Sequence, residues 1–208
     1  TRRRAVDAGS WAHLLRNRQL LAAFGVGFCV LFTQVALFTY VTFYAAGPPF
    51  HLSTVALGWL FAVYLVGAGI TPIAGHVVDR YGHRVAIGGA MLISAAGALL
   101  TLVPSMAGLI GGLALGATGV FTSQATTSSF IGAVTRRDRA LAVGLYSACY
   151  YAGGSAGAAL PALVWSRWGW WACIALVVAV QATGATVALT QWSRASTPHD
   201  LLMPEGGV

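Results

Sequence analysis

Few residues of this chain have the types and spacing that acid, base, nucleophilic or metal chemistry requires. His76 and Asp79 are three positions apart and could share one helix face, but two ligands make a poor metal site. No phosphate-binding loop of the form G-x-x-x-x-G-K-[ST] occurs in the sequence. Hydrolysis or group transfer would require an assembled base, nucleophile or metal. We therefore expect no enzyme activity, no metal site and no cofactor.

The remaining reactive side chains divide between polar segments and apolar runs. The five carboxylates lie outside the apolar runs, at Asp7, Asp79, Asp138, Asp200 and Glu205. The three cysteines lie inside them, where a thiol behaves as a small hydrophobe, at Cys29, Cys149 and Cys173. Disulfides are not expected. A carboxylate that could couple proton movement within a membrane is not among these residues.

Hydroxyl and amide side chains are the polar groups that the apolar runs do contain. By the 3.6-residue period, one helix face carries four hydroxyls: Thr118, Thr122, Thr126 and Ser129. Gln34 and Gln124 differ from these, because a primary amide has four hydrogen-bonding needs and cannot meet them on its own backbone. Polar groups in lipid are costly unless they face a partner or a cavity. Ser and Thr can instead bond their own i−4 carbonyl, so a packing role stays open for them.

Six apolar runs must position these groups. Hydrophobic residues make up 57% of the chain and charged residues only 8%, whereas soluble domains have about 25% charged residues. A spanning helix needs roughly 20 apolar residues, and six stretches qualify: 20–44, 55–78, 85–103, 107–130, 140–165 and 169–192. The sequence therefore predicts an all-α integral membrane protein with six transmembrane helices, preceded by a basic segment (1–18) and followed by a polar tail (193–208).

The positive charge is distributed as expected for membrane topology. The net charge is +7, and all twelve basic residues are arginines between the apolar runs, which argues against a nucleic-acid-binding face. Eleven of them fall in the first segment, the second-to-third loop, the fourth-to-fifth loop and the tail, and only Arg167 falls on the other side. The positive-inside rule then predicts a multi-pass protein of the plasma (inner) membrane with both termini in the cytoplasm.

A shift of 87 residues aligns the chain with itself. It pairs Tyr64 with Tyr151, and the segment 79–82 (DRYG) with 166–169 (SRWG). Each copy holds three predicted helices, about 19–103 and 107–192, so the second copy must be upside down relative to the first. Inverted three-helix repeats are typical of secondary transporters. Glycines at every fourth residue predict close helix packing at 108, 112 and 116 and at 153 and 157.

One loop resembles a known signature. The segment 75–84, GHVVDRYGHR, resembles the G-x-x-x-D-R-x-G-R-R loop of the major facilitator superfamily and connects the second and third predicted helices. It departs from the signature at His83 and matches at Gly75, Asp79, Arg80, Gly82 and Arg84. The resemblance implies that these five residues gate the transporter by holding one conformation, with Asp79 pairing with Arg80 or Arg84 or accepting from a helix N-terminus. The alternative is that they only orient the loop.

The resemblance also implies an architecture and a solute site. The chain looks like the C-terminal six-helix half of such a transporter, similar in texture to bacterial efflux permeases, with an N-terminal six-helix half as its partner. In that family the first and fourth helices of each half line a central cavity. Contact with a small-molecule solute is thus expected at Thr33, Gln34, Tyr40, Thr122 and Thr126, and next at Gln124, Tyr146 and Tyr150.

A second functional class stays open from the sequence. The chain could be a non-transporting six-helix membrane module, or a half-transporter that needs a partner subunit. A lone half should not transport, because alternating access rocks one bundle against the other. The sequence leaves the solute, the coupling ion, the direction of transport and the oligomeric state open.

Overall fold

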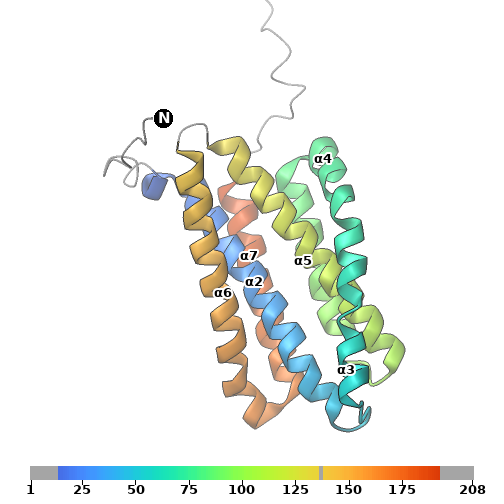
Figure 1. Ribbon diagram of the computed structural model, residues 1–208. Helices are drawn as coiled ribbons and strands as arrows, with labels where there is room; N and C mark the ends of the chain where they lie inside the picture. The colour runs from blue at the N-terminus through green and yellow to red at the C-terminus, as the bar shows by residue number, and fades with distance from the viewer. Residues whose placement is uncertain (1–13, 136–137, 193–208) are drawn as a thin grey trace, which may run out of the picture.

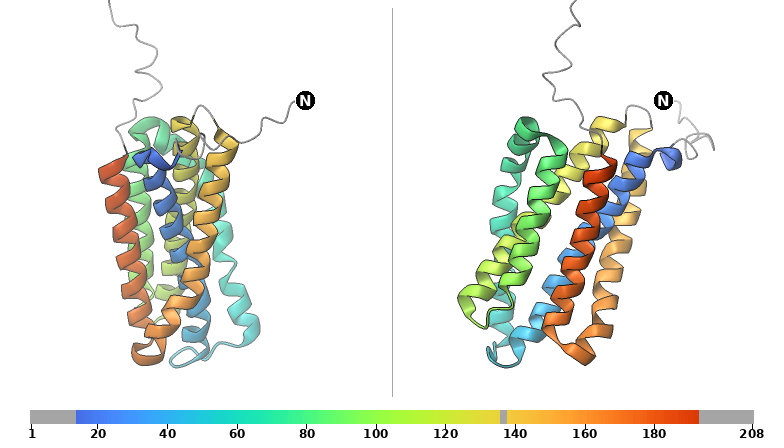
Figure 2. Two further views of the ribbon diagram at one scale, coloured as in Figure 1. Left: turned by 90° about the vertical axis from the view of Figure 1, so that its left-hand side faces the viewer. Right: turned by 180° about the vertical axis from the view of Figure 1, so that it is seen from behind.

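The computed structural model describes residues 14–135 and 138–192. The predicted tail 193–208, most of the basic segment 1–18, and Arg136 and Arg137 lie outside these residues. Within them the chain is a single bundle of helices that run alongside one another (Figures 1 and 2). The elements are α2 (Arg18–Ala46), α3 (Thr54–Leu60), α4 (Val63–Leu100), α5 (Met106–Val134), α6 (Arg139–Trp168) and α7 (Trp170–Gln191).

Side-chain caps fix where three of these helices begin. The Asn17 side chain accepts from the backbone N–H of Gln19 at 3.0 Å. The hydroxyls of Ser53 and Ser105 accept from the N–H groups three residues later, at 3.3 and 3.0 Å. Each cap satisfies a backbone donor that the first helical turn leaves unpaired. These caps begin α2, α3 and α5, so the helix starts follow from local sequence.

α4 contains a sharp break at Gly82. This residue has φ 79° and ψ 163°, a conformation that glycine adopts without the steric penalty of a Cβ. The break divides α4 into a first arm (63–81) and a second arm (83–100), which run alongside one another in Figures 1 and 2. The turn that the sequence predicted between its second and third helices is therefore present as one glycine.

Four helices of the described chain are long and apolar enough to cross a membrane, where six were predicted. They are Arg18–Ala46, Gly75–Leu100, Met106–Val134 and Trp170–Gln191. The apolar helical stretch Thr54–Ile70, which includes the start of the first arm of α4, is shorter than a span, and α6 does not reach the hydropathy of one. α6 has 30 residues, about 45 Å of helix, so length is not its limit. Its tyrosines, serines and glycines lower its hydropathy instead.

Glycines bring the helix backbones into contact where the sequence predicted small-residue stripes. A Cβ at Gly153 or Gly157 of α6 would collide with the backbone carbonyls of Phe28 and Phe32 in α2. A Cβ at Gly112 of α5 would lie 2.6 Å from the carbonyl oxygen of Gly97 in α4. Both glycine-spacing predictions are thus confirmed as helix contacts. They hold α6 against α2, and α5 against the second arm of α4.

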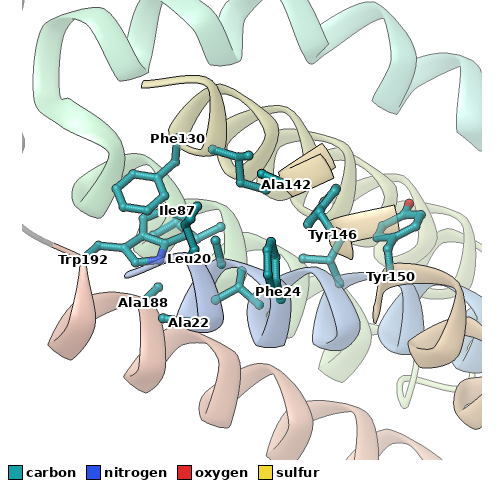
Figure 3. Close-up of a cluster of buried hydrophobic side chains, with 14 of the residues drawn as sticks. Leu20, Ala22, Phe24, Ile87, Phe130, Ala142, Tyr146, Tyr150, Ala188 and Trp192 are labelled. Carbon is teal, nitrogen blue, oxygen red and sulfur yellow. The ribbon is translucent and has the colours of Figure 1, made fainter. Parts of the chain in front are cut away.

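Two buried apolar clusters fill the bundle, one toward each end. The first contains Ile87, Phe130, Tyr146 and Trp192 (Figure 3). In it the rings of Phe130 and Trp192 stack at 4.0 Å. The second contains Phe32, Leu37, Leu109 and Trp170. The helix α2 contributes residues to both clusters and contacts α5, α6 and α7. It is therefore the central helix of the bundle.

Candidate functional site

Gln34 of α2 and Tyr64 of the first arm of α4 form one half of a polar and aromatic cluster. The Gln34 amide interacts with the Tyr64 hydroxyl. Gln34 Oε1 is nevertheless buried and has no hydrogen-bond partner among the described residues. The Tyr64 ring stacks on Phe38 at 4.2 Å and meets the edge of Phe121 at 5.8 Å. These rings hold the Tyr64 hydroxyl in position beside the amide.

Tyr146 and Tyr150 of α6 form the other half. Their ring centroids are 5.7 Å apart, and Tyr150 lies near Tyr64. Figure 3 shows both side chains next to α2, where Gly27 leaves the space that the Tyr146 ring occupies. The Tyr146 hydroxyl is buried without a hydrogen-bond partner, although Ser128 of α5 lies near it. We call Gln34, Tyr64, Tyr146 and Tyr150 the tyrosine–glutamine cluster.

Gln124 lies on the side of α5 that faces this cluster. It is three residues after Phe121 and four before Ser128, so the three share one face of the helix. Phe121 contacts Tyr64, and Ser128 lies near Tyr146. The fold therefore brings together four of the eight residues expected to contact solute: Gln34, Gln124, Tyr146 and Tyr150.

The other four expected residues lie elsewhere. Thr33 is 1% exposed and faces Ser94 and Gln181 inside the bundle. The Tyr40 hydroxyl donates to the carbonyl of Ala158 at 2.8 Å, which ties α2 to α6. Thr122 lines an apolar groove along α4, and Thr126 is buried beside Asp79. Thr33 is next to Gln34 in sequence, and Thr122 and Thr126 are each two residues from Gln124. Residues one or two positions apart on a helix point to different faces, so these threonines do not face the cluster.

The signature loop is fastened to two other helices. His83 Nε2 lies 3.2 Å from the Ser129 hydroxyl of α5, and its ring meets the edge of Phe130. Arg84 donates to the backbone carbonyl of Leu189 near the end of α7. Cations are favoured there, because carbonyl groups at a helix C-terminus carry partial negative charge. The loop therefore contacts the ends of α5 and α7.

Asp79 makes no ion pair with Arg80 or Arg84, which was one of the arrangements expected. Asp79 is exposed, and no ion pair joins it to another residue of the described ranges. The Arg80 guanidinium instead lies 5.4 Å from the centroid of the neighbouring Tyr81 ring. Asp79 lines a cavity between α4 and α5 together with Gly75, Thr126 and Ser129. Its carboxylate is therefore available to a group outside this chain segment.

Sequence reasoning did not predict that Tyr64 and Phe121 lie at the tyrosine–glutamine cluster, or that His83 fastens the signature loop to α5. Tyr64 had appeared in the alignment of the chain with itself, opposite Tyr151, but not as a site residue. Phe121 precedes Gln124 by one helical turn, so the period alone places it on that face. His83 occupies the one position at which the loop departs from the signature. The contacts of all three depend on helices far away in sequence.

The chemistry of the cluster is that of a neutral binding surface. It offers one amide and three phenols, which donate and accept hydrogen bonds and present aromatic faces. Among the residues that the structure describes, no group of three or more His, Cys, Asp or Glu side chains could hold a metal ion. The cluster can therefore orient an uncharged or amphipathic molecule, while the signature loop can act on helix positions.

The bundle, its glycine contacts and the signature loop agree with one known family. The sequence profile of the Major Facilitator Superfamily matches residues 23–202. The chain belongs to the Major Facilitator Superfamily. It is accordingly a multi-pass membrane protein of a transporter family. The resemblance first seen in the loop 75–84 is thereby confirmed.

Curated relatives have the same character. The chain is 37% identical over 152 residues to the MFS-type transporter YybF of Bacillus subtilis, an alignment that covers 73% of this chain and 38% of YybF. It is 33% identical over 154 residues to the inner membrane transport protein YnfM of Escherichia coli, covering 72% of this chain and 36% of YnfM. This superfamily chain thus spans little more than a third of the length of these relatives.

A solved structure has the same fold. The crystal structure of the POT family transporter PepTSo superposes with a TM-score of 0.72 over 83% of this chain and 37% of its own. The sequences are 18% identical in that superposition, so the likeness concerns the fold. Both comparisons place this superfamily chain on one part of a longer transporter fold.

Proposed function

We propose that this chain is one six-span half of a secondary transporter, which moves a small solute across the plasma membrane by alternating access, in the direction of efflux. The tyrosine–glutamine cluster carries the proposal for the solute. It combines a buried amide oxygen without a partner on α2 with one phenol on α4 and two on α6. An N-terminal six-helix half would supply the opposite wall of the cavity.

The proposal of two inverted repeats is supported by pairs of contacts related by the 87-residue shift. Gly97 of α4 packs on the backbone of Gly116 in α5. Gly184 is 87 positions after Gly97, and Cys29 is 87 positions before Gly116. These two residues also pack together, because a Cβ added at Gly184 would lie 3.0 Å from the Cβ of Cys29. Equivalent positions thus make equivalent helix contacts, as two copies related by a twofold axis would.

A second pair concerns the turns. Gly82 and Gly169 are 87 residues apart, and they are the glycines with positive φ in the described chain, at 79° and 69°. Gly82 joins the two arms of α4, and Gly169 joins α6 to α7. In this arrangement the first arm of α4 corresponds to α6, and the second arm to α7. That correspondence supports counting the first arm and α6 as spans, although the apolar stretch Thr54–Ile70 is short and α6 has a lower hydropathy.

For the signature loop we propose gating. The loop is fixed to α5 through His83 and to α7 through Arg84, while Asp79 is exposed and unpaired in the described chain. A carboxylate in that position can accept from the other half in one conformation and lose that contact in another. The arginines of the inner loops also support an orientation with both termini in the cytoplasm.

Transport in the full-length protein tests the solute site. Energised inverted membrane vesicles would be incubated with uncharged amphipathic fluorescent dyes. Accumulation of dye inside the vesicles would be followed for wild type, Gln34→Leu and Tyr150→Phe. Accumulation that depends on energy is expected for wild type and is lost in Gln34→Leu. Thr183→Val is the matched control, because its hydroxyl bonds its own helix at the carbonyl of Ala179. Wild-type accumulation in both cluster variants would contradict the proposed site.

The second candidate is a half-transporter that needs a separate partner subunit, or a module that does not transport. Reconstitution of the purified 208-residue chain alone separates these readings from the first. Dye transport by the monomeric chain would contradict the proposal that a second half is required.

A further inference from the structure

Four buried polar side chains meet inside the bundle, away from the tyrosine–glutamine cluster. They are Thr33 of α2, Ser94 of the second arm of α4, Ser123 of α5 and Gln181 of α7, and they are 1, 2, 2 and 4% exposed. Gln181 Nε2 donates to Ser94 Oγ at 2.9 Å. The group thus contains one internal hydrogen bond and joins four helices.

Three oxygens of this group have no partner in the described chain. They are Thr33 Oγ1, Ser123 Oγ and Gln181 Oε1. Hydroxyls of membrane helices commonly bond the carbonyl one turn earlier, as Thr118 and Thr127 do here. Thr33 and Ser123 do not. A buried oxygen without a partner costs about 1–3 kcal/mol, so three around one point require an occupant that bonds them.

A small cavity lies between these oxygens. Besides the four polar residues it is lined by Cys29, Val30, Met91 and Val120. Its volume is about 10 Å³, which is room for the centre of one water molecule, and a buried water needs two to four polar partners. A solute or a side chain does not fit this space. None of the eight lining residues is charged.

We propose that this cavity is a binding site for one water molecule. The water donates to Gln181 Oε1 and exchanges hydrogen bonds with the hydroxyls of Thr33 and Ser123. A water is favoured over a metal cation, because the lining has no carboxylate to offset the dehydration of a charge. The site therefore explains why Thr33, expected to contact solute, is buried and points away from Gln34.

The bound water links α2 and α5 to α4 and α7. Gln181 and Ser94 are related by the 87-residue shift of the repeat, and so are Val120 and Thr33. The site thus lies where equivalent positions of the two proposed repeats meet. It holds the first and fourth predicted helices against the third and sixth, so that the bundle moves as one body. This function does not depend on which solute is carried.

The sign of a stability change tests the proposal. The purified 208-residue chain in lipid nanodiscs would be unfolded by heat as wild type and as Thr33→Val, a nearly isosteric change. If a water bridges the site, the variant loses one of its bonds and the midpoint falls, by about 2–4 °C for each kcal/mol lost in a chain of this size. If the cavity is dry, removal of an unpaired hydroxyl raises the midpoint. An unchanged or raised midpoint overturns the proposal.

A double-mutant cycle adds a second readout. The hydroxyls of Thr33 and Ser123 make no bond to each other, so only the water couples them. The loss in Thr33→Val with Ser123→Ala should be smaller than the sum of the single losses. Thr186→Val is the matched control, because its hydroxyl bonds Ala182 in its own helix, and its effect should add to that of Thr33→Val. Additive losses for Thr33 and Ser123 would overturn the shared water.

Two further measurements cover a cation and a misfolded variant. Sodium and potassium chloride would be replaced by choline chloride at equal ionic strength. A wild-type midpoint that depends on the metal ion, with that dependence lost in Thr33→Val, would show a cation in the site and overturn the water. A high-resolution crystal structure of the wild-type chain should have a density peak at hydrogen-bonding distance from Gln181 Oε1. An empty cavity there contradicts the proposal without any variant.

Discussion

Arg84 donates a hydrogen bond to the backbone carbonyl of Leu189, 105 residues later in the chain. Arg84 belongs to the loop between the two arms of α4, and this bond fastens that loop to the end of α7. The sequence predicts that Asp79 pairs with Arg80 or Arg84 or accepts from a helix N-terminus. In the structure Arg84 bonds the end of α7, so this arginine also holds α7 in place.

Replacement of Arg84 by Gln should therefore destabilise the bundle. The change removes a charge-assisted bond and a cation at a helix C-terminus, worth about 1 kcal/mol at this partly buried position. Thermal unfolding of the nanodisc-embedded chain should begin about 2–4 °C lower. Arg80→Gln is the control, because Arg80 contacts only the neighbouring Tyr81 ring. Equal shifts for the two variants would argue against the capping role.

Two glycines of α6 should respond to alanine with opposite signs. Gly153→Ala places a Cβ against the Phe28 carbonyl in α2, and overpacking of this kind costs typically 1–3 kcal/mol. A Cβ at Gly144 meets nothing within 4 Å, so Gly144→Ala gains the higher helix propensity of alanine, about 1 kcal/mol in water. Unfolding midpoints measured side by side should fall for Gly153→Ala and not for Gly144→Ala. A fall of equal size in both would refute the close approach of α6 and α2.

Asp79→Ala in the full-length protein should abolish most transport while leaving membrane insertion intact. The carboxylate is exposed and forms no ion pair in the described chain, and it interacts with His83 of the same loop, so its loss should leave the helix packing of the bundle in place. Asp138→Ala is the matched control, because Asp138 is an exposed acidic residue at the start of α6. Dye flux and the amount of protein in the membrane would be measured together. Normal flux in Asp79→Ala would end the gating proposal.

The hydroxyl of Tyr40 should contribute to stability and not to solute binding. Tyr40→Phe removes the 2.8 Å bond to Ala158 and should lower the stability by about 0.5–1.5 kcal/mol. The affinity for a transported dye should not change. Tyr44 makes ring contacts with Phe50 and Trp170, so Tyr44→Phe is expected to alter neither quantity. A weaker dye affinity in Tyr40→Phe would restore Tyr40 as a solute contact.

The proposed orientation can be measured with single cysteines. In a background where Cys29, Cys149 and Cys173 are replaced by alanine, Ala140→Cys marks the start of α6, on the proposed inner side, and Ser166→Cys marks its end, on the proposed outer side. A membrane-impermeant maleimide should label Ser166→Cys in intact cells, and Ala140→Cys only in inverted vesicles. The reverse pattern would contradict the proposed orientation.

The sequence predicted the helices well, because their signals are local. Apolar runs, the caps Asn17 and Ser105, and the glycine at position 82 act within a few residues of themselves. The signature loop was sufficient to indicate the family, because its residues are contiguous. The weaker predictions concerned two spans. The helix α6 falls below the hydropathy of a span, because it is rich in tyrosine, serine and glycine, and the apolar stretch Thr54–Ile70 is shorter than a span.

The face that each polar residue presents was decided only by the tertiary structure. Thr33 and Gln34 are adjacent in sequence, yet one faces Gln181 inside the bundle and the other faces Tyr64. Their separation follows from the helical rotation of about 100° per residue together with the placement of α4 and α7 around α2. The sequence by itself determined that the chain is helical and apolar. Long-range packing determined which of its few polar groups meet each other, because those contacts join helices that are far apart in the chain.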